Sequence, residues 1–389
     1  MLKTLAIANY RSLLDLRVGL SPLNVITGPN GSGKSNAYRA LRLLADTAGG
    51  GVIRSLAREG GLASTFWAGP GSLSKAMKSG DEPIQGTVSN GPARLLMGFA
   101  GEDFGYGISL GLTPPGSLGP TAFDLDPQIK HECIWAGEFY RPASSLLERS
   151  GPLLKVRQER RWDVMTQHMP MFESIFQYRA NPGLPPEAVS VRETIAGWRF
   201  YDHFRTDPLA PARQAQLGTR TPVLDDEGAQ LAAALQTIIE IGDREALMEA
   251  VDDAFPGATL SISVSDDHRF SLRFQQRGLL RPLSGAELSD GTLRYLLWIA
   301  ALLTPRPPSL MVLNEPETSL HPDLLPALAR LMISAAKRSQ LIVVSHARRL
   351  VAALEKDPEC NAIALEKTLG QTQVAGQGLL DTPAWHWPE

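Results

Sequence analysis

Cysteine is almost absent from this 389-residue chain, which contains only Cys133 and Cys360. The two lie far apart in the sequence and show no Cys-x-x-Cys spacing, which argues against a zinc site. So few cysteines are typical of a reducing compartment, and we therefore expect a cytoplasmic protein.

Long apolar runs are absent as well. No stretch of 18 apolar residues occurs, so the sequence predicts no membrane-spanning helix and no membrane partner. Residues 1–4 lead directly into strand-like sequence without a signal-peptide pattern. The net charge of −3 provides no global basic field for nucleic acid, although a local basic face stays open. The densest basic run, residues 155–162, is more typical of a solvated face than of a nucleic-acid site.

What the chain does contain is one glycine-rich stretch that fits the phosphate-binding pattern G-x-x-x-x-G-K-[ST]. Its glycines allow a tight turn whose N–H groups point at phosphate oxygens. Lys34 is placed to reach the β- and γ-phosphates, and the Ser35 hydroxyl to bind Mg²⁺. Residues 23–27 are predicted to form a buried strand before this loop, and residues 36–46 a helix that presents its N-terminus to the phosphates. The candidate nucleotide-binding residues of this segment are Gly28, Pro29, Asn30, Gly31, Ser32, Gly33, Lys34, Ser35 and Asn36.

A second group of polar residues follows apolar elements later in the chain. Ser289 and Gly291 precede a strongly apolar helix, and they make its N-terminus a second candidate anion site. Residues 310–314 are predicted to form a buried strand that ends in Asn314 and Glu315. A carboxylate at that strand end is placed to face the phosphates. We expect Glu315 to orient and deprotonate the attacking water.

Another apolar strand, residues 340–344, ends at Ser345 and His346. The carboxyl ends of parallel strands gather at one edge of an α/β sheet, so His346 is expected beside Glu315. In this order of elements we assign His346 as a sensor of the γ-phosphate.

Two further residues are weaker candidates. Arg11 lies in a polar turn that precedes the glycine-rich loop. This place in the chain makes it a candidate for contacting the base or phosphate of a nucleotide, and a plain polar turn is the alternative. His203 lies in a loop crowded with polar and aromatic groups and is more typical of a structural residue, with a role beside the nucleotide as the alternative.

The remaining segments mainly define the architecture. Alternating apolar residues predict strands at residues 2–7, 13–20, 104–112, 132–136, 259–264 and 270–275, with two more within 83–99. Helical spacing predicts mostly helices between residues 143 and 255, at 165–179, 186–200 and 228–241, and a further helix at 323–337. We therefore expect an α/β fold with an N-terminal antiparallel β lobe. Residues 1–140 and 256–389 would form a split domain, and residues 141–255 a mostly helical insertion.

Taken in order, the motifs resemble a known family. They are the glycine-rich loop, a long insertion, Leu-Ser-Asp-Gly-Thr, a strand with Asn-Glu-Pro-Glu-Thr-Ser-Leu-His-Pro, and a strand with Ser-His. This series is similar to the ABC-type ATPase head of RecF, SMC and OLD-family proteins. The similarity is closest to bacterial predicted AAA family ATPases, which have this head without a transporter or nuclease domain. The motifs cover residues 1–47 and 280–350 and are specific as a set.

The resemblance implies a P-loop NTPase of ABC type with ATP and Mg²⁺ as cofactors. Residues 28–35 correspond to the Walker A loop. Asn314 and Glu315 match Walker B, where Glu315 is the catalytic base and Asn314, with Ser35, lies on the metal side. His346 matches the switch histidine of the family.

The resemblance also implies a homodimer. Ser289, Asp290 and Gly291 match the signature motif, which in the family contacts the γ-phosphate bound to the opposite subunit. Two heads would therefore meet around two ATP molecules. Residues 319–322 resemble the D-loop, and Arg11 resembles the basic residue that touches the nucleotide in SMC-like heads.

The chain departs from the family pattern in several places. The usual Walker B Asp, which commonly helps to hold Mg²⁺ through water, is Asn314 here, so binding is expected and fast hydrolysis less so. The Q-loop glutamine is not placed, since Gln85, Gln128 and Gln158 are all candidates. No Cys-x-x-Cys hook or long coiled-coil arm occurs. Only 43 residues follow His346 (389 − 346), too few for the nuclease domain of OLD-type proteins.

Three functions compete on this basis. The first is an ATPase that acts as a switch in DNA repair or anti-phage defence, with DNA or an effector protein as partner. The second is a nucleotide-gated scaffold that binds a protein partner with little turnover, which Asn314 favours slightly. The third is the engine subunit of a transporter, disfavoured because the chain has no membrane segment and its insertion replaces the compact coupling region. We prefer the first.

Overall fold

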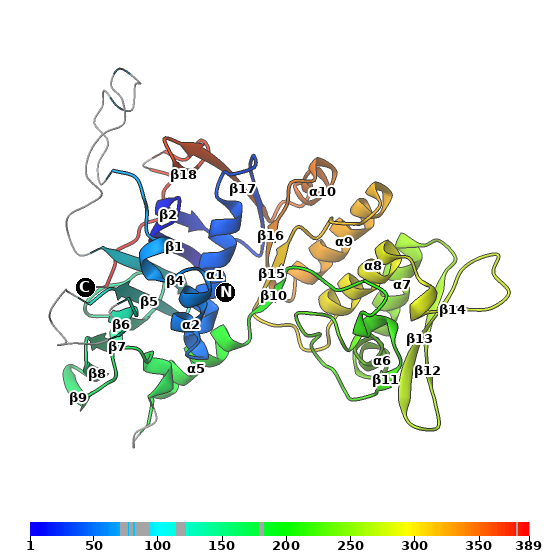
Figure 1. The fold of residues 1–389 in the computed structure, drawn as a ribbon, viewed down its shortest axis with the longest axis horizontal. Coiled ribbons are helices and arrows are strands. Elements are labelled where there is room, and N and C mark those ends of the chain that lie inside the picture. Colours follow the sequence, from blue (N-terminus) through cyan, green and yellow to red (C-terminus); the bar gives the residue numbers. More distant parts are fainter. Residues whose placement is uncertain are drawn as a thin grey trace. The chain divides into compact units, whose positions relative to one another are not determined.

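The structure is a computed structural model that describes residues 1–70, 77, 81, 93–113, 122–123, 125–178, 183–378 and 380–388. Contacts group the chain (Figure 1) into two compact units. The first unit comprises Met1–Leu20, Gly28–Gly197 and Ile363–Glu389, and the second comprises Ser21–Thr27 and Trp198–Ala362. The insertion expected at residues 141–255 stays a prediction.

An eight-stranded antiparallel sheet dominates the first unit, in the order β2-β1-β4-β5-β6-β7-β8-β9. Its strands are β1 (Leu2–Tyr10), β2 (Leu13–Gly19), β4 (Arg94–Gly101), β5 (Phe104–Gly111), β6 (Gln128–Ala136), β7 (Ser145–Ser150), β8 (Leu153–Gln158) and β9 (Arg161–Thr166). Helix α1 (Lys34–Ala48) contacts β1 and β4 and buries one apolar face, on which Ala37, Leu41 and Leu44 follow one another at helical spacing. The expected N-terminal antiparallel lobe is therefore confirmed.

Shorter elements complete the first unit. They are α2 (Val52–Arg58), α3 (Leu62–Thr65), the 3₁₀ helix η1 (Ile175–Gln177), α5 (Pro186–Ala196) and the antiparallel pair β17 (Cys360–Thr368) and β18 (Gln371–Val374). The first three residues of β17 belong to the second unit. Of the strands expected within 83–99, residues 83–92 lie outside the described part, and residues 94–99 belong to β4.

The helical character expected after residue 143 is wrong for its first part. Residues 145–166 form the strands β7, β8 and β9. In β7, buried residues alternate with more exposed ones at a spacing of two, the period of a strand rather than a helix. The helix expected at 165–179 is also absent from the described residues 165–178, where only η1 is helical.

A buried ion pair explains why residues 165–179 do not form that helix. The side chains of Arg149 and Glu132 are both fully buried, with Nη1 and Oε2 3.2 Å apart. Arg149 also donates hydrogen bonds to the carbonyl oxygens of Pro170 and Glu173, and Glu132 accepts one from the N–H of Ile175. These tertiary hydrogen bonds use backbone groups that an α-helix would satisfy internally.

Four parallel strands form the centre of the second unit, in the order β10-β15-β16-β3. They are β10 (Arg199–Tyr201), β15 (Leu310–Asn314), β16 (Gln340–Val344) and β3 (Leu23–Thr27). β15 and β16 are almost entirely buried, as apolar strands inside a parallel sheet should be. Tyr201 is aligned with Leu313, Asn314 with Val344, and Val344 with Ile26, so all four strands end at one edge.

Helices and a hairpin complete the second unit. The helices are α6 (Leu231–Ile241), α7 (Arg244–Ala254), α8 (Asp290–Leu302), α9 (Leu325–Ala336) and α10 (Arg348–Leu354), with 3₁₀ helices η2 (Pro211–Arg213), η3 (Gly285–Glu287) and η4 (Pro322–Leu324). The hairpin of β12 (Thr259–Val264) and β13 (Arg269–Gln275) is extended by β11 (Gln216–Leu217) and β14 (Leu283–Ser284). Ten consecutive residues of α8 are buried, so this helix forms the core of the unit.

The helix expected at 186–200 is correct only for its first part, since α5 ends at Ala196 and β10, a parallel strand that was not predicted, begins at Arg199. Residues 228–241 contain α6, and residues 323–337 contain the end of η4 and α9, as expected. The β12–β13 hairpin is confirmed. In the described part of the chain, no helix is both long and apolar enough to cross a membrane.

Candidate nucleotide site

The glycine-rich loop begins directly after β3 and leads into α1. Gly28, Gly31 and Gly33 have φ values of 146°, 79° and 109°, a region that favours glycine. A Cβ atom on Gly28 would lie 2.3 Å from the carbonyl oxygen of Leu365. One on Gly33 would lie 2.1 Å from Oγ1 of Thr372. The loop conformation therefore requires glycine at both positions.

A chain of hydrogen bonds holds the loop within the first unit. Oγ1 of Thr372, in β18, donates to the carbonyl oxygen of Ser32 at 2.7 Å. The hydroxyl of Ser12 lies 2.7 Å from that of Thr372 and accepts a hydrogen bond from Nδ2 of Asn36 at 2.8 Å. Since each hydroxyl has one proton, the chain runs from Asn36 through Ser12 and Thr372 to Ser32. Asn36 thus braces the loop through two residues that the sequence did not identify.

Lys34 lies over the loop that precedes it. Its side chain is largely buried, and Nζ donates to the carbonyl oxygens of Gly28 at 2.6 Å and Pro29 at 3.0 Å. Ser35, the next residue of α1, is exposed. The buried hydroxyl of Ser32 has no hydrogen-bond partner among the described residues. An ammonium group, an unused hydroxyl and a helix N-terminus on one loop form a donor set that fits a phosphate group.

Arg11 is held by an acidic residue of the same unit. Its Nη2 lies 2.8 Å from Oε2 of Glu59. The same oxygen accepts a hydrogen bond from the hydroxyl of Tyr10 at 2.7 Å. The backbone of Arg11 has a φ of 50° and donates to the carbonyl oxygen of Thr65. Its contact with a nucleotide stays a prediction, and Glu59 is the partner that such a contact would have to compete with.

In the second unit, the ends of β15 and β16 bring Glu315 and His346 together. The N–H of Glu315 donates to the carbonyl oxygen of Val344 at 2.8 Å, and its φ is 47°. Left-handed backbone at a non-glycine residue is uncommon and often marks functional positions. Nδ1 of His346 lies 3.6 Å from Oε1 of Glu315, and both side chains are about half exposed (56% and 47%). The expected proximity is therefore present, while the roles of both residues stay predictions.

Glu317 binds the backbone of the His346 segment, a role that the sequence did not predict. Its side chain is almost fully buried, and Oε1 accepts hydrogen bonds from the hydroxyl of Ser345 at 2.8 Å and from the N–H groups of His346 and Ala347 at 3.0 and 3.1 Å. Oε1 is also 3.4 Å from Nδ1 of His346. Sequence offered one signal for it, the second carboxylate of Asn-Glu-Pro-Glu.

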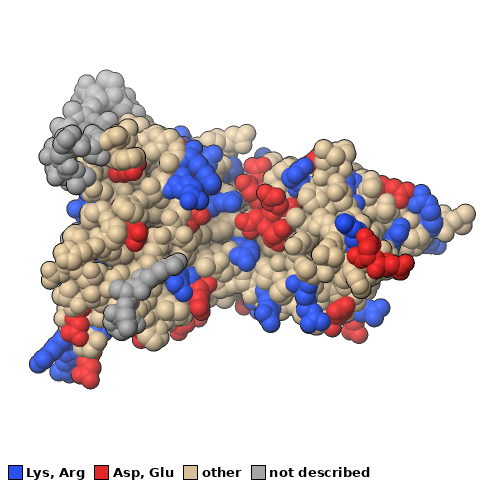
Figure 2. Space-filling model, turned by 60° about the horizontal axis from the view of Figure 1, so that its bottom comes forward, with Lys and Arg blue, Asp and Glu red and all other residues tan. Residues whose placement is uncertain are grey.

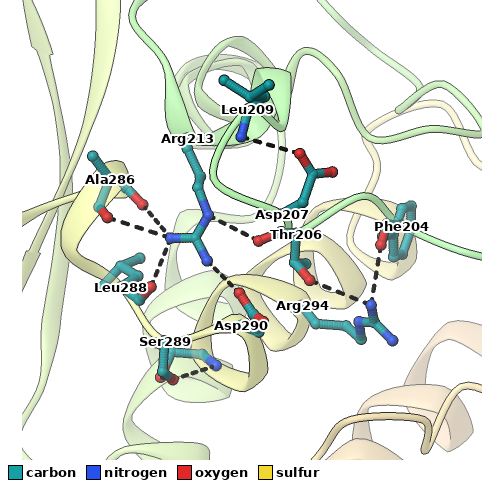
Figure 3. Close-up of polar contacts among 12 residues, drawn as sticks. Phe204, Thr206, Asp207, Leu209, Arg213, Ala286, Leu288, Ser289, Asp290 and Arg294 are labelled. Carbon is teal, nitrogen blue, oxygen red and sulfur yellow. Dashed lines mark hydrogen bonds and ion pairs between the residues drawn. The ribbon is translucent and has the colours of Figure 1, made fainter.

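The signature segment lies at the start of α8. Oγ of the exposed Ser289 accepts the N–H of Thr292 at 3.2 Å and so caps the helix. Figure 3 shows how Arg213 holds this segment: it donates to the carbonyl oxygen of Leu288 at 2.6 Å and pairs with Asp290 at 2.5 Å. Asp290 is therefore turned toward Arg213, and Ser289 stays exposed at the N-terminus of α8.

A buried arginine connects α8 to the segment that follows β15. Arg294 donates through Nη1 to the carbonyl oxygen of Thr318 at 2.9 Å and through Nη2 to that of Phe204 at 3.1 Å. A Cβ atom on Gly291 would lie 3.2 Å from the carbonyl oxygen of Ser319. The start of the expected D-loop thus packs against the signature segment. The signal for Arg294 in the sequence is a single charge inside a buried apolar helix.

Asn314, at the Walker B position, has a partner on the neighbouring strand. Nδ2 of Asn314 donates to Oδ1 of Asp202, the residue that follows β10. Asp202 was not among the candidates, because nothing in its local sequence predicts that β10 pairs with β15.

The remaining candidates are not brought to these segments by any contact that the structure describes. Gln85 lies outside the described residues. Gln128 begins β6 and accepts a hydrogen bond from Lys130, and Gln158 ends β8. His203 is exposed after β10. The identity of a Q-loop glutamine therefore stays open.

A family model described as "AAA domain, putative AbiEii toxin, Type IV TA system" matches residues 23–352. The chain belongs to this AAA-domain family. The matched region runs from β3 past His346 and includes the glycine-rich loop and the signature segment. Arg11, Ser12 and Thr372 lie outside it. No curated protein matches the chain.

Solved SMC heads have a similar structure to this AAA-domain protein. An SMC head bound to the C-winged helix domain of ScpA is 13% identical with a TM-score of 0.50, covering 97% of this chain and 98% of that one. The SMC head domain from Thermotoga maritima is 14% identical with a TM-score of 0.49, covering 97% of this chain and 99% of that one. An Smc head domain with an extended coiled coil, bound to the C-terminal domain of ScpA derived from Pyrococcus furiosus, is 12% identical with a TM-score of 0.49, covering 97% of this chain and 96% of that one. The first likeness shows the fold, which is that of an SMC head domain.

The residues of this AAA-domain protein fit Mg²⁺ bound together with a nucleotide. In the described part of the chain no group of three or more His, Cys, Asp or Glu side chains could hold a metal ion by itself. Mg²⁺ with ATP needs fewer protein ligands, because phosphate oxygens and waters fill most of its coordination positions. Each unit by itself offers hard oxygen donors of the type that Mg²⁺ prefers. In the first unit this is the hydroxyl of Ser35, and in the second unit these are the amide and carboxylate oxygens of Asn314 and Asp202.

The face that Figure 2 shows has no broad basic field. Lys and Arg form small groups on it, and several of these lie next to Asp and Glu. The basic run at 155–162 lies on the β8–β9 hairpin, where Lys155 and Arg157 lie 5.2 and 5.6 Å from the ring centre of Trp162. Lys155 also lies 3.8 Å from Oε1 of Glu148, and Arg157 donates to the carbonyl oxygen of Pro142, so both cations already have partners within the first unit.

Proposed function

We propose that this AAA-domain protein binds and hydrolyses Mg·ATP, and that two copies associate head to head around two nucleotides. One observation carries the proposal. The chain enters the glycine-rich loop at the end of β3, and Glu315 and His346 follow the next strands of the same parallel sheet, 3.6 Å apart. Ligands of α/β proteins bind at such carboxyl edges.

The glycine-rich loop would bind the phosphates. Its positive-φ glycines allow backbone N–H groups to turn inward, and the α1 N-terminus adds a favourable dipole. Lys34 would exchange its two neutral carbonyl partners for phosphate oxygens, which is favourable because the negative charge of the phosphate attracts the ammonium group more strongly than a carbonyl dipole does. The hydroxyl of Ser32 would gain the partner that it lacks.

Hydrolysis would use the residues at the strand ends. Glu315 orients a water molecule toward the γ-phosphate and accepts its proton. His346 donates a hydrogen bond to the γ-phosphate, and Glu317 holds the backbone on which His346 lies. Bound Mg²⁺ would neutralise charge that develops on the phosphate oxygens, with Ser35 and Asn314 on its protein side.

The dimer is supported by the signature segment. Ser289 is exposed at the N-terminus of a 13-residue helix whose first turn is braced by Arg213 and Arg294. A rigid, exposed helix N-terminus is suited to bind an anion held by a second copy.

For the biological role we propose a switch in anti-phage defence or DNA repair, and the family description, which names a toxin of a toxin–antitoxin system, supports defence. DNA and an effector protein are the proposed partners. A nucleotide-gated scaffold with little turnover is the second candidate, because an amide replaces the carboxylate at position 314.

The test is light scattering after size exclusion on the Glu315→Gln variant, with and without Mg·ATP. We expect a monomer without nucleotide and a stable dimer with it, because the variant binds ATP and does not hydrolyse it. Glu249→Gln, an exposed glutamate on α7, is the matched control and should turn over ATP like the wild type. Wild-type hydrolysis is then measured with and without duplex DNA. A Glu315→Gln variant that hydrolyses ATP normally would contradict the proposed mechanism.

Stimulation of hydrolysis by DNA would support the repair or defence ATPase. Tight ATP binding and ATP-dependent dimerisation with negligible wild-type turnover would favour the scaffold.

A further inference from the structure

The Walker B position of this chain lacks a carboxylate, and the sheet places one beside it. β10 and β15 run parallel, with Tyr201 aligned to Leu313. Asn314, the last residue of β15, and Asp202, which directly follows β10, therefore lie side by side at the carboxyl edge, and Nδ2 of Asn314 donates to Oδ1 of Asp202. The carboxylate lies one strand away from where the family pattern has it.

This hydrogen bond determines how the amide of Asn314 is turned. A primary amide has a donor NH₂ group and an acceptor oxygen, and a carboxylate accepts only from the NH₂ group. The hydrogen bond to Asp202 thus holds Nδ2 of Asn314 on the side of β10, and Oδ1 of Asn314 points away from Asp202. That oxygen is the atom able to accept a hydrogen bond from water bound to Mg²⁺ or to contact the ion itself.

The charge of Asp202 is also available. The structure describes no lysine or arginine within ion-pair distance of this carboxylate, and the side chain is exposed. Asp207, five residues later, differs because it forms an ion pair with Arg205 at 3.0 Å. A carboxylate that is hydrogen-bonded to an amide and not neutralised by a cation can still attract a divalent ion.

We propose that Asp202 and Asn314 together replace the single Walker B aspartate, with Asn314 offering its oxygen to the hydrated Mg²⁺ and Asp202 supplying the charge and the orientation. Asp202 is thus a positioning residue on the metal side. The inference rests on the proposed function, since it concerns the Mg²⁺ that accompanies ATP. Outer-sphere partners of this type commonly change metal affinity by about ten- to a hundredfold when removed.

The experiment measures Mn²⁺, which replaces Mg²⁺, by electron paramagnetic resonance, with the full chain saturated by a non-hydrolysable ATP analogue. We expect Asp202→Asn to weaken Mn²⁺ binding about ten- to a hundredfold. Binding of the analogue without metal should be unchanged, because the glycine-rich loop is intact. Asp207→Asn is the control of identical chemistry on the same loop, and it should bind Mn²⁺ like the wild type.

The decisive variant moves the charge back to β15. Asp202→Asn combined with Asn314→Asp should restore Mn²⁺ affinity to near the wild-type value. Asn314→Asp alone should bind Mn²⁺ at least as tightly as the wild type, because the cation relieves the repulsion between the two adjacent carboxylates. Wild-type affinity in Asp202→Asn, or a double variant as weak as the single one, would overturn the inference. A wild-type chain that binds no nucleotide at all would instead refute the proposed function, and the inference with it.

Discussion

Removing the charge of Glu317 should lower both stability and hydrolysis while sparing ATP binding. Oε1 of this buried carboxylate accepts three hydrogen bonds, from Ser345, His346 and Ala347. Hydrogen bonds to a charged acceptor contribute about 1.5–3 kcal/mol each and those to a neutral one about 0.5–1.5 kcal/mol. Glu317→Gln keeps the acceptor oxygen and loses about 1 kcal/mol per bond, so the free energy of unfolding should fall by about 2–3 kcal/mol.

Glu317→Ala is the larger perturbation of the same site. It leaves the hydroxyl of Ser345 and the N–H of His346 without the acceptor that Glu317 provides, while the N–H of Ala347 keeps Oγ of Ser345 as its second acceptor at 3.1 Å. We expect a loss of about 3–5 kcal/mol. Stability is measured by urea unfolding, and ATP affinity and turnover are measured at a temperature where both variants are folded. We expect ATP affinity near the wild-type value and turnover reduced at least about tenfold, because His346 is no longer held. An alanine variant with wild-type unfolding midpoint and turnover would refute this role.

The remaining predictions concern the loop and the signature segment. Lys34→Ala should weaken ATP binding about a hundredfold or more by titration calorimetry, and unchanged affinity would contradict the phosphate-binding role. Gly33→Ala should also abolish ATP binding, since a Cβ atom would meet Thr372 at 2.1 Å, and a variant that binds ATP normally would show that the loop has another conformation. Ser289→Arg should bind ATP as a monomer in light scattering, and an ATP-dependent dimer would refute the trans-signature model. Arg213→Met should lower the free energy of unfolding by about 2–3 kcal/mol in urea, because several carbonyl groups lose a charged donor, and no loss would mean that η2 and α8 are held otherwise.

The glycine-rich loop shows how far local sequence chemistry reaches. Its glycines, its lysine and the strand and helix on either side are specified by adjacent residues, so the segment from β3 to α1 was predicted correctly. The proximity of Glu315 and His346 was also predictable, because parallel strands of one sheet end at a common edge.

The errors arose where distant residues decide the backbone. Residues 165–179 have helical spacing, and the structure instead uses the backbone of Pro170, Glu173 and Ile175 to satisfy the buried pair of Arg149 and Glu132. An isolated helix of that length is marginal, so such tertiary bonds override its propensity.

By itself, the sequence of this protein determined the elements that build the phosphate loop and the order of the polar strand ends, because both depend on neighbouring residues and on the rules of parallel sheets. Only the tertiary structure showed that Thr372 closes on Ser32 across 340 residues, that Glu317 holds His346, and that Asp202 lies beside Asn314. Each of these contacts depends on which segments become neighbours in space. Packing of the whole core determines this arrangement, and no local sequence pattern does.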